Sequence, residues 1–368
     1  MDGIAIRAES AAFTSRAAGT SRLPPSSFAW VDTGNPMPED TDTVVERERV
    51  RSNADGSVEI TGPVPRGQHV RAAGEDFLAD QELAPAGHRL RPADLAAAAA
   101  AGHATLAVAR QPVVAMVPTG NEIQPAGSAP RPGGVVDSNS LMLAARATEI
   151  GARPLVSDVQ PDDEAAIGAE LRRVGAAADL VLIIAGSSAG RGDHTAAVIA
   201  QAGSLTVRGV AVRPGHPVLL GHALISGAAP GISGAAPGQA EAGRPVTAVP
   251  VIGVPGYPVA AAVIFELFAV PLLLALQGAG PADQIGRHVQ LACDWTSSPE
   301  AEDWVPVSLS SAPADPDATG PVVATPCGHG AGSISRLLNA DAWWQIPAGQ
   351  GKFARGDLIE VRQSPTLL

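Results

Sequence analysis

The 368-residue sequence is poor in lysine, aromatic residues and cysteine, and these scarcities exclude several classes of protein. Lys352 is its single lysine, and its 25 basic residues stand against 37 acidic ones, for a net charge of −12. Such a chain is repelled by a phosphate backbone. Aromatic residues, at 3%, offer few rings on which nucleic-acid bases could stack. The composition therefore argues against nucleic-acid binding.

Targeting and redox signals are equally scarce. The two cysteines, Cys293 and Cys327, lie far apart and outside any CxxC spacing, which is typical of idle thiols in a reducing cytosol. The N-terminus lacks the charged and apolar regions of a signal peptide. The longest apolar run, residues 257–276, contains Glu266 and two prolines and has no Lys/Arg anchors nearby. We expect a buried helix there, and a soluble cytoplasmic protein with no membrane partner.

Length and turn content indicate several domains. Hydrophobic residues make up 45% of the chain, enough for a sizeable core. The 40 glycines and 33 prolines favour many turns and argue against a helical bundle or a coiled coil.

The middle of the chain alternates apolar strands with helices. The pattern predicts strands at 112–117, 154–159, 179–184, 206–212, 218–220 and 249–254, and helices at 140–150, 164–177, 195–202 and 258–276. This alternation is typical of a mostly parallel sheet covered on both faces, so we predict an α/β domain at 109–278. The segment SGAAPG at 226–231 recurs at 233–238 and is interpreted as a surface insertion.

The flanking regions have short β-type runs instead. Before the α/β domain, strands are predicted at 43–50 and 57–61, followed by an alanine-rich helix at 95–101. After residue 281, strands are predicted at 289–292, 305–309, 321–324 and 358–361, which fits a small C-terminal β-barrel or sandwich. The fold class is therefore α/β and multidomain, with a central α/β domain between β-rich modules.

Two loops at predicted strand ends could carry chemistry. Ligands of open parallel sheets bind at the carboxyl ends of the strands, which places Glu122 and the loop 185–193 near such a site. In that loop small residues let backbone N–H groups approach an anion, Ser188 adds a hydroxyl, and Asp193 could hold a hard cation. A Mg²⁺ shared by Glu122, Asp193 and a phosphate would suit phosphoanhydride chemistry. A tight turn capped by Asp193 explains the same residues and is commoner.

Two proline-glycine turns follow other strands. Arg213 in the run RPGHP offers a planar fork to an oxyanion, while His216 is either a donor or a turn residue. The turn VPGYP leads into the apolar helix, where Pro258 suits the first helical position. The sequence has no Walker A motif, no complete GxGxxG and no HExxH, which argues against a P-loop enzyme and a zinc site.

Taken together and in order, these loops resemble the molybdopterin molybdenumtransferase family, of the type found in MoeA and in the E domain of gephyrin. The matching segments span nearly the whole chain: MDGIAIR at 1–7, DTGNPMP at 32–38, GED at 74–76, TGNEI at 119–123, DSN at 137–139, the loop 186–193, RPGHP at 213–217 and PGYPV at 255–259.

The resemblance implies an enzyme that inserts molybdate into adenylylated molybdopterin with Mg²⁺ and releases AMP. It implies four parts: a helical or linker segment at 1–10 and 75–108, a small β module at 11–74, the molybdopterin-binding domain at 109–278 and a C-terminal β domain at 281–368. It also implies a homodimer, and a molybdopterin adenylyltransferase as a possible partner.

The resemblance also implies roles for individual residues. Glu122 and Asp193 would hold Mg²⁺ and, with Asp2, form the catalytic set. Substrate-binding positions would be Thr33, Asp76, Thr119, Gly120, Asp162, Gly186, Ser188, Gly190, Arg213, His216 and Ser333.

The chain departs from the family pattern at several positions. His216 replaces a usual lysine, Tyr257 replaces asparagine, and Pro118 stands where a serine often occurs. The family normally has a helical segment before the MDG motif, whereas this sequence starts at that motif. These departures leave open a second hypothesis, a non-catalytic molybdopterin or molybdenum-cofactor carrier. A third, the adenylylating enzyme of the same pathway, is disfavoured by the flanking modules. The pattern does not distinguish molybdate from tungstate.

Overall fold

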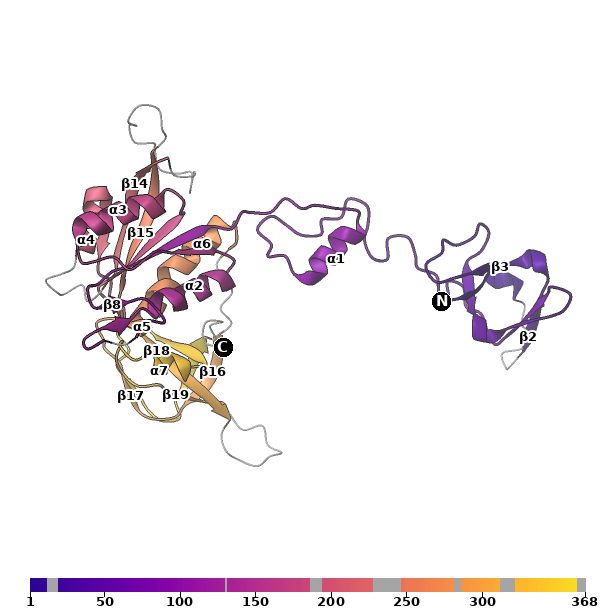
Figure 1. Ribbon diagram of the computed structural model, residues 1–368. Helices are drawn as coiled ribbons and strands as arrows, with labels where there is room; N and C mark the ends of the chain where they lie inside the picture. Colours follow the sequence, from indigo (N-terminus) through magenta and orange to yellow (C-terminus); the bar gives the residue numbers. More distant parts are fainter. Residues whose placement is uncertain are drawn as a thin grey trace. The chain divides into compact units, whose positions relative to one another are not determined.

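The computed structural model describes residues 1–11, 19–129, 131–185, 194–227, 246–280, 286–311 and 322–362. The chain forms two compact units. The first comprises Met1–Ala84 and Arg91–Ala104, and the second comprises Pro85–Leu90 and Thr105–Leu368. Figure 1 shows the helices and strands of each unit.

The first unit contains two small antiparallel sheets and a short helix. One sheet has the order β3-β1-β4 and the other β2-β6-β5. Their bounds are β1 Gly3–Ile6, β2 Thr20–Leu23, β3 Phe28–Val31, β4 Thr43–Glu46, β5 Val50–Ser52 and β6 Val58–Thr61. Ile4, Val45 and Ile60 are fully buried between the elements. At Gly3 a Cβ atom would lie 1.9 Å from the Val45 carbonyl oxygen, so only glycine fits this close strand approach.

Two predictions for this unit were wrong in detail. The strand predicted at 43–50 is broken by a 3₁₀ turn, Arg47–Arg49, through which the chain passes from one sheet to the other. The helix predicted at 95–101 is α1, Pro92–Ala100. The helix begins three residues before the predicted start, because Pro92 suits the first turn of a helix and the Asp94 carboxylate accepts the Arg91 N–H at 2.7 Å.

The second unit is built on a six-stranded sheet of order β10-β7-β11-β15-β14-β12. Its strands are β7 Val113–Pro118, β10 Arg153–Val156, β11 Leu180–Ala185, β12 Gly203–Arg208, β14 Leu219–Ser226 and β15 Val246–Pro255. The first four in the sheet order are parallel, as predicted, whereas β14 and β12 are antiparallel additions at the edge. The predicted strand 206–212 does not form as such: β12 ends at Arg208, and Val212–Arg213 (β13) pairs elsewhere. Of the two SGAAPG copies, only Ser226 and Gly227 lie within the described residues.

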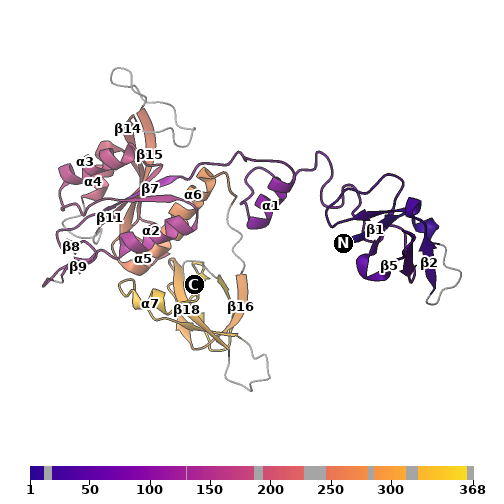
Figure 2. The same cartoon turned by 45° about the vertical axis from the view of Figure 1, so that its right-hand side comes forward.

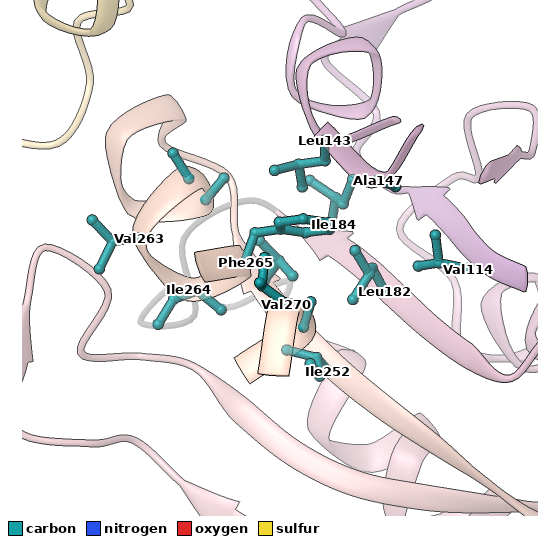
Figure 3. Packing of buried hydrophobic residues seen from close by; sticks show 14 of the residues in the cluster. Val114, Leu143, Ala147, Leu182, Ile184, Ile252, Val263, Ile264, Phe265 and Val270 are labelled. Carbon is teal, nitrogen blue, oxygen red and sulfur yellow. The ribbon is translucent and has the colours of Figure 1, made fainter. Parts of the chain in front are cut away.

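Helices cover both faces of this sheet. The helices α2 Asn139–Glu149, α5 Pro258–Ile264 and α6 Val270–Leu276 pack on one face, and α3 Glu164–Gly175 and α4 Thr195–Ala202 on the other (Figure 1 and Figure 2). On the first face Phe265 and Val270 meet Leu182 and Ile252 of the sheet, with Leu143 of α2 beside them (Figure 3). Two short strands, β8 Ile123–Gln124 and β9 Val135–Val136, pair outside the sheet.

The apolar segment Pro258–Leu276 is long and apolar enough to cross a membrane, with a mean hydropathy of 2.5. In this fold it is a core helix, because its buried residues pack on the sheet and 56% of it is buried. A π-helical segment, Phe265–Ala269, joins α5 to α6. Glu266 in that segment forms a buried ion pair with Arg146 of α2, at 2.7 Å between Glu266 Oε1 and Arg146 Nε. The sequence-based expectation of a buried helix is confirmed.

The C-terminal part of the second unit is a closed five-stranded barrel of order β18-β19-β16-β22-β20, in which β20 returns to β18. Its strands are β16 Gly286–Leu291, β18 Glu302–Ser311, β19 Val322–Pro326, β20 Ala342–Ile346 and β22 Leu358–Arg362. Smaller elements are β17 Trp295–Thr296, α7 Ser335–Leu338 and β21 Lys352–Phe353. The strand β13 pairs in parallel with β18, with Arg213 opposite Asp303, and so joins the barrel to the α/β part.

Candidate functional site

A first cavity, of about 640 Å³, opens at the carboxyl ends of β7, β11 and β15. This is the position at which parallel sheets bind ligands. Two carboxylates, Glu122 and Asp137, and the polar side chains of Thr119, Ser138 and Asn139 stand in an otherwise largely apolar lining. That lining includes Pro118, Ile123, Val135, Val136, Ile184, Pro217, residues 255–258, Gly332 and Ile334.

The loop after β7 places Glu122 at this cavity. Thr119 is buried, and its N–H donates to the Ile184 carbonyl at 2.9 Å, which ties the loop to the end of β11. Gly120 has φ +142°, and a Cβ there would lie 2.7 Å from Ile123 Cγ1 and 3.1 Å from Glu122 Oε2. Glycine therefore allows the exposed Glu122 carboxylate to fold back over the loop. Of the predicted site residues, Thr119 and Glu122 line the cavity, and Gly120 lies in the loop between them.

Asp162 braces this loop from the neighbouring connection. The Asn121 N–H donates to Asp162 Oδ2 at 3.1 Å, and the Asp162 N–H faces Asn121 Oδ1 at 3.4 Å. The Gly120 N–H also donates to the Gln160 carbonyl at 3.0 Å. Asp162 is not among the residues that line the first cavity, so its contact with the site runs through Asn121.

The start of α2 forms the opposite wall, which the sequence reasoning left out of its list of candidates. Asp137 Oδ1 accepts the Ser140 N–H at 3.0 Å and so caps the helix. The buried Asn139 side chain donates from Nδ2 to the Gly256 carbonyl at 2.7 Å. This bond joins α2 to the turn before α5, two walls 117 residues apart in the chain. The DSN run at a helix start was the available signal.

A second cavity, of about 430 Å³, lies between the α/β part and the barrel, and Pro217, Pro255 and Tyr257 line both cavities. Arg213 and His216 line it, and the peptide bond between Arg213 and Pro214 is cis. Its other walls include Trp295, Thr296, Ser298, residues 303–306 and residues 328–331.

Tyr257, the single tyrosine, stands in the wall that the two cavities share. Its side chain packs against Gly332, where a Cβ would lie 3.4 Å from Tyr257 Cδ1, and the residue is 57% exposed. The backbone nearby is also joined to the barrel part, because the Val259 N–H donates to the Ala331 carbonyl at 3.0 Å.

Ser333, the predicted oxyanion contact of the C-terminal part, lies between two residues of the first cavity, Gly332 and Ile334. Its Oγ lies 2.7 Å from Ser335 Oγ, and it does not itself line either cavity.

In the first unit, Asp2 and Thr33 are brought together. Asp2 Oδ1 accepts bonds from the Thr33 hydroxyl at 2.7 Å and from its N–H at 2.8 Å. These two bonds hold the pKa of the exposed Asp2 carboxyl below its ordinary value, and the bond from the Thr33 hydroxyl has the larger effect. Asp76, also predicted, is exposed and pairs with Arg71. All three residues belong to the first unit.

Gly186, Ser188, Gly190 and Asp193 lie outside the described residues. His194, which follows them, contacts Glu164 of α3 at 3.2 Å, and Gln201 Nε2 donates to the second oxygen of Glu164 at 3.0 Å. The contact with His194 is the main cause of a lowered pKa at Glu164. Within the seven described stretches, no three His, Cys, Asp or Glu side chains converge as a metal site.

Three family models match the chain in order. The MoeA N-terminal region (domain I and II) matches residues 1–102, the probable molybdopterin binding domain matches residues 115–275, and the MoeA C-terminal region (domain IV) matches residues 288–363. The chain belongs to the MoeA-type molybdopterin molybdenumtransferase family. The first cavity lies chiefly in the second of these regions, and the second cavity lies between the second and the third.

Individual relatives agree with this membership. A molybdopterin molybdenumtransferase of Nostoc sp. is 28% identical over 350 residues, covering 93% of this chain and 73% of its own length. Molybdopterin molybdenumtransferase 2 of Mycobacterium tuberculosis is 32% identical over 285 residues, covering 75% of this chain and 64% of its own. The molybdopterin biosynthesis MoeA protein of Pyrococcus horikosii has a similar structure, with a TM-score of 0.75, 28% identity and coverage of 99% of this chain and 86% of its own. MoeA relatives thus match both the sequence and the fold.

Proposed function

We propose that this protein is a molybdopterin molybdenumtransferase of molybdenum cofactor biosynthesis, which inserts molybdate into adenylylated molybdopterin and releases AMP. The observation that carries the proposal is the first cavity, at the carboxyl ends of three parallel strands inside the region matched by the molybdopterin-binding family model. Relatives named for this activity match across most of the chain.

The lining of the first cavity suits a pterin ring. Apolar residues such as Ile184 and Pro255 offer flat packing surfaces, and the cavity is large enough for a small-molecule ligand. A pterin edge is rich in N–H donors, and the carboxylates of Glu122 and Asp137 and the side chain of Ser138 are acceptors at that lining. The cavity thus combines apolar faces with acceptors at their rim.

The donor chemistry of the proposed magnesium ligands also fits. Mg²⁺ is usually held by one or two carboxylates, with waters and substrate phosphates completing its shell. Glu122, exposed at the cavity, is one such carboxylate, and Asp193 is the proposed second. Bound there, the ion would supply neutralisation of negative charge on the adenylyl phosphate.

The other residues have positioning and binding roles in this proposal. Thr119 and Gly120 hold the Glu122 loop, and Asp162 braces it through Asn121. Further substrate contacts are proposed for Gly186, Ser188, Gly190, Arg213, His216 and Ser333. Asp2, Thr33 and Asp76 are proposed as further substrate contacts, with Asp2 in the catalytic set.

For the whole chain we propose the four-part organisation predicted from the sequence and a cytoplasmic location. The proposal also includes a homodimer and an exchange of substrate with a molybdopterin adenylyltransferase.

The test is AMP release from adenylylated molybdopterin mixed with molybdate, Mg²⁺ and the full chain. The E122Q variant keeps the side-chain shape but removes the charge, and D193A removes the second carboxylate. We expect each to lower the rate by at least about 100-fold, the range of losses when a group that stabilises developing charge is removed. E360Q, at an exposed position on β22, is the matched control and should leave the rate unchanged.

Two outcomes would contradict the proposal. Wild-type protein that binds molybdopterin but releases no AMP would be a carrier, the alternative that the departures at Pro118 and His216 leave open. Normal turnover by E122Q or D193A would remove the assigned role of that carboxylate.

A further inference from the structure

An exposed arginine and an exposed tryptophan form a stacked pair at one end of the β3-β1-β4 sheet. The Arg47 guanidinium lies over the ring of Trp30, 4.4 Å from its centroid. Phe28 supports the same ring edge-on, with centroids 6.0 Å apart and an interplanar angle of 87°. Trp30 is 46% exposed, whereas the other four tryptophans are 8% exposed or less. The pair therefore fixes a cation at the surface, because a guanidinium is attracted to the face of an indole ring.

The strand register places this pair beside Asp2, a residue of the proposed catalytic set. Trp30 lies opposite Ile4 in the pairing of β1 with β3. On the other side of β1, the Arg47 N–H donates to the Asp2 carbonyl at 2.9 Å. The Arg47 side chain therefore reaches across the start of β1 to contact Trp30. Asp2 and Thr33, which are bonded to each other at this end of the sheet, belong to the same unit.

The guanidinium of Arg47 is available to a ligand. Its side chain forms no hydrogen bond or ion pair with any residue that the structure describes, so its N–H donors have no acceptor oxygen there. Glu46, the preceding carboxylate, is bound instead by His69, at 2.7 Å between Glu46 Oε1 and His69 Nε2. Asp2 Oδ1 accepts both bonds from Thr33. The charge of Arg47 is thus left to attract a ligand anion.

We infer that Arg47, held in place by Trp30, binds a tetrahedral oxyanion as a further substrate contact of the first unit. The planar fork of guanidinium donors matches the paired oxygens of such an anion. Arg47 is the binding residue and Trp30 is a positioning residue. This assignment rests on the proposed function, which supplies two anions of this chemistry: molybdate and the phosphoanhydride of adenylylated molybdopterin.

The direct experiment is calorimetric titration of the full chain with molybdate and, separately, with inorganic pyrophosphate, which carries a phosphoanhydride. For at least one of them, R47A should weaken binding on the order of 10-fold, the lower end for a hydrogen bond to a charged group, because Arg47 is exposed. W30A should weaken binding of the same anion by about threefold, the effect of a cation–π contact at an exposed site, and W30F should bind it as the wild type does.

The AMP-release assay gives a readout that a merely structural role would not move. A contact with molybdate predicts that R47A raises KM for molybdate about 10-fold and leaves KM for the adenylylated substrate unchanged, and a contact with the phosphoanhydride predicts the reverse. In either case kcat should stay within about twofold, as for a lost binding interaction. R47K keeps the charge without the planar fork, so its KM should fall between those of the wild type and R47A.

The matched control is R51A, which removes the same charge from an exposed position on β5 of the same unit and should bind and turn over as the wild type does. The melting temperature of R47A should equal that of the wild type, since the side chain is exposed. Unchanged binding of both anions by R47A, equal losses for R47A and R51A, or equal rises in both KM values would overturn the inference.

The two assays together separate this inference from the proposed function. Anion binding that depends on Arg47 in a protein that releases no AMP would support the oxyanion contact and refute the transferase activity. AMP release by the wild type, with anion binding and KM values that R47A does not change, would refute the oxyanion contact alone.

Discussion

The buried ion pair between Arg146 and Glu266 gives the sharpest prediction about stability. Their side chains are 7% and 8% exposed, and two contacts join them, Nε–Oε1 at 2.7 Å and Nη2–Oε2 at 3.2 Å. Burial alone would lower the pKa of Arg146, but the bonds and charge of Glu266 and Glu149 outweigh it and raise that pKa. The pair joins α2, which carries one wall of the first cavity, to the π-helical segment.

In E266Q the charge of one partner is removed while its shape is kept. An unpaired buried charge costs about 3–5 kcal/mol. Glu149, 3.2 Å from Arg146 Nη1 and 49% exposed, stays in place, so we expect the lower end, about 3 kcal/mol. At about 2–4 °C per kcal/mol for a unit of this size, the melting temperature should fall by roughly 6–12 °C.

Scanning calorimetry of the full chain measures this effect. The transition of the second unit should shift, and E149Q, which breaks the exposed contact alone, should shift it by less than about 1 kcal/mol. The double variant R146M/E266L replaces both charges with apolar groups and should recover most of the loss. A shift for E266Q no larger than that for E149Q would refute the reasoning, as would a double variant less stable than E266Q.

Two further predictions concern pH and the shared wall. Burial alone would raise the pKa of Asp179, but bonds from Arg110 and the Val113 N–H outweigh it and lower that pKa below the ordinary 3.8. The free energy of unfolding of the wild type should therefore exceed that of D179N above about pH 5, and this difference should shrink as the pH falls below 3.8. Urea titrations at each pH measure it, and a difference that stays constant with pH would contradict the prediction. Tyr257→Asn should raise KM for the adenylylated substrate about fivefold at unchanged kcat and melting temperature, because an aromatic contact is lost from a 57% exposed position. Tyr257→Phe keeps the ring and should behave as the wild type. An unchanged KM for Tyr257→Asn would exclude a binding role of this residue.

The central sheet could be predicted because its strands are buried on both faces and are therefore apolar throughout. Residues 180–184 are an example, since each is buried at 5% exposure or less. The strands of the first unit were harder to find. In β3, which consists of four apolar residues, Trp30 is 46% exposed and Val31 is buried, so the run shows no alternation of polar and apolar residues that would mark a half-buried strand. The pairing of β13 with the barrel depends on residues 302–303, far along the chain, and leaves no local pattern.

The candidate site could be predicted in part. The loop at 119–122 follows a strong strand, so its place at a sheet edge followed from topology alone. The second cavity could not be found in this way, because Tyr257, Trp295 of β17 and His329 come from three separate segments that meet only in the folded unit. Asp162 illustrates the opposite case. It was predicted to contact the substrate, and in the structure its carboxylate accepts the N–H of Asn121 in the neighbouring loop.

The parallel pairing of β13 with β18 also limits how the second unit can move. Arg213 ends a strand that pairs with the barrel's sheet, and His216 follows it, yet the chain returns within a few residues to the α/β sheet through β14. A hinge opening between these two parts would have to break main-chain hydrogen bonds on that short crossing. Entry and departure of ligands should therefore depend on side chains such as Tyr257 and His329 swinging aside, rather than on the barrel tilting away.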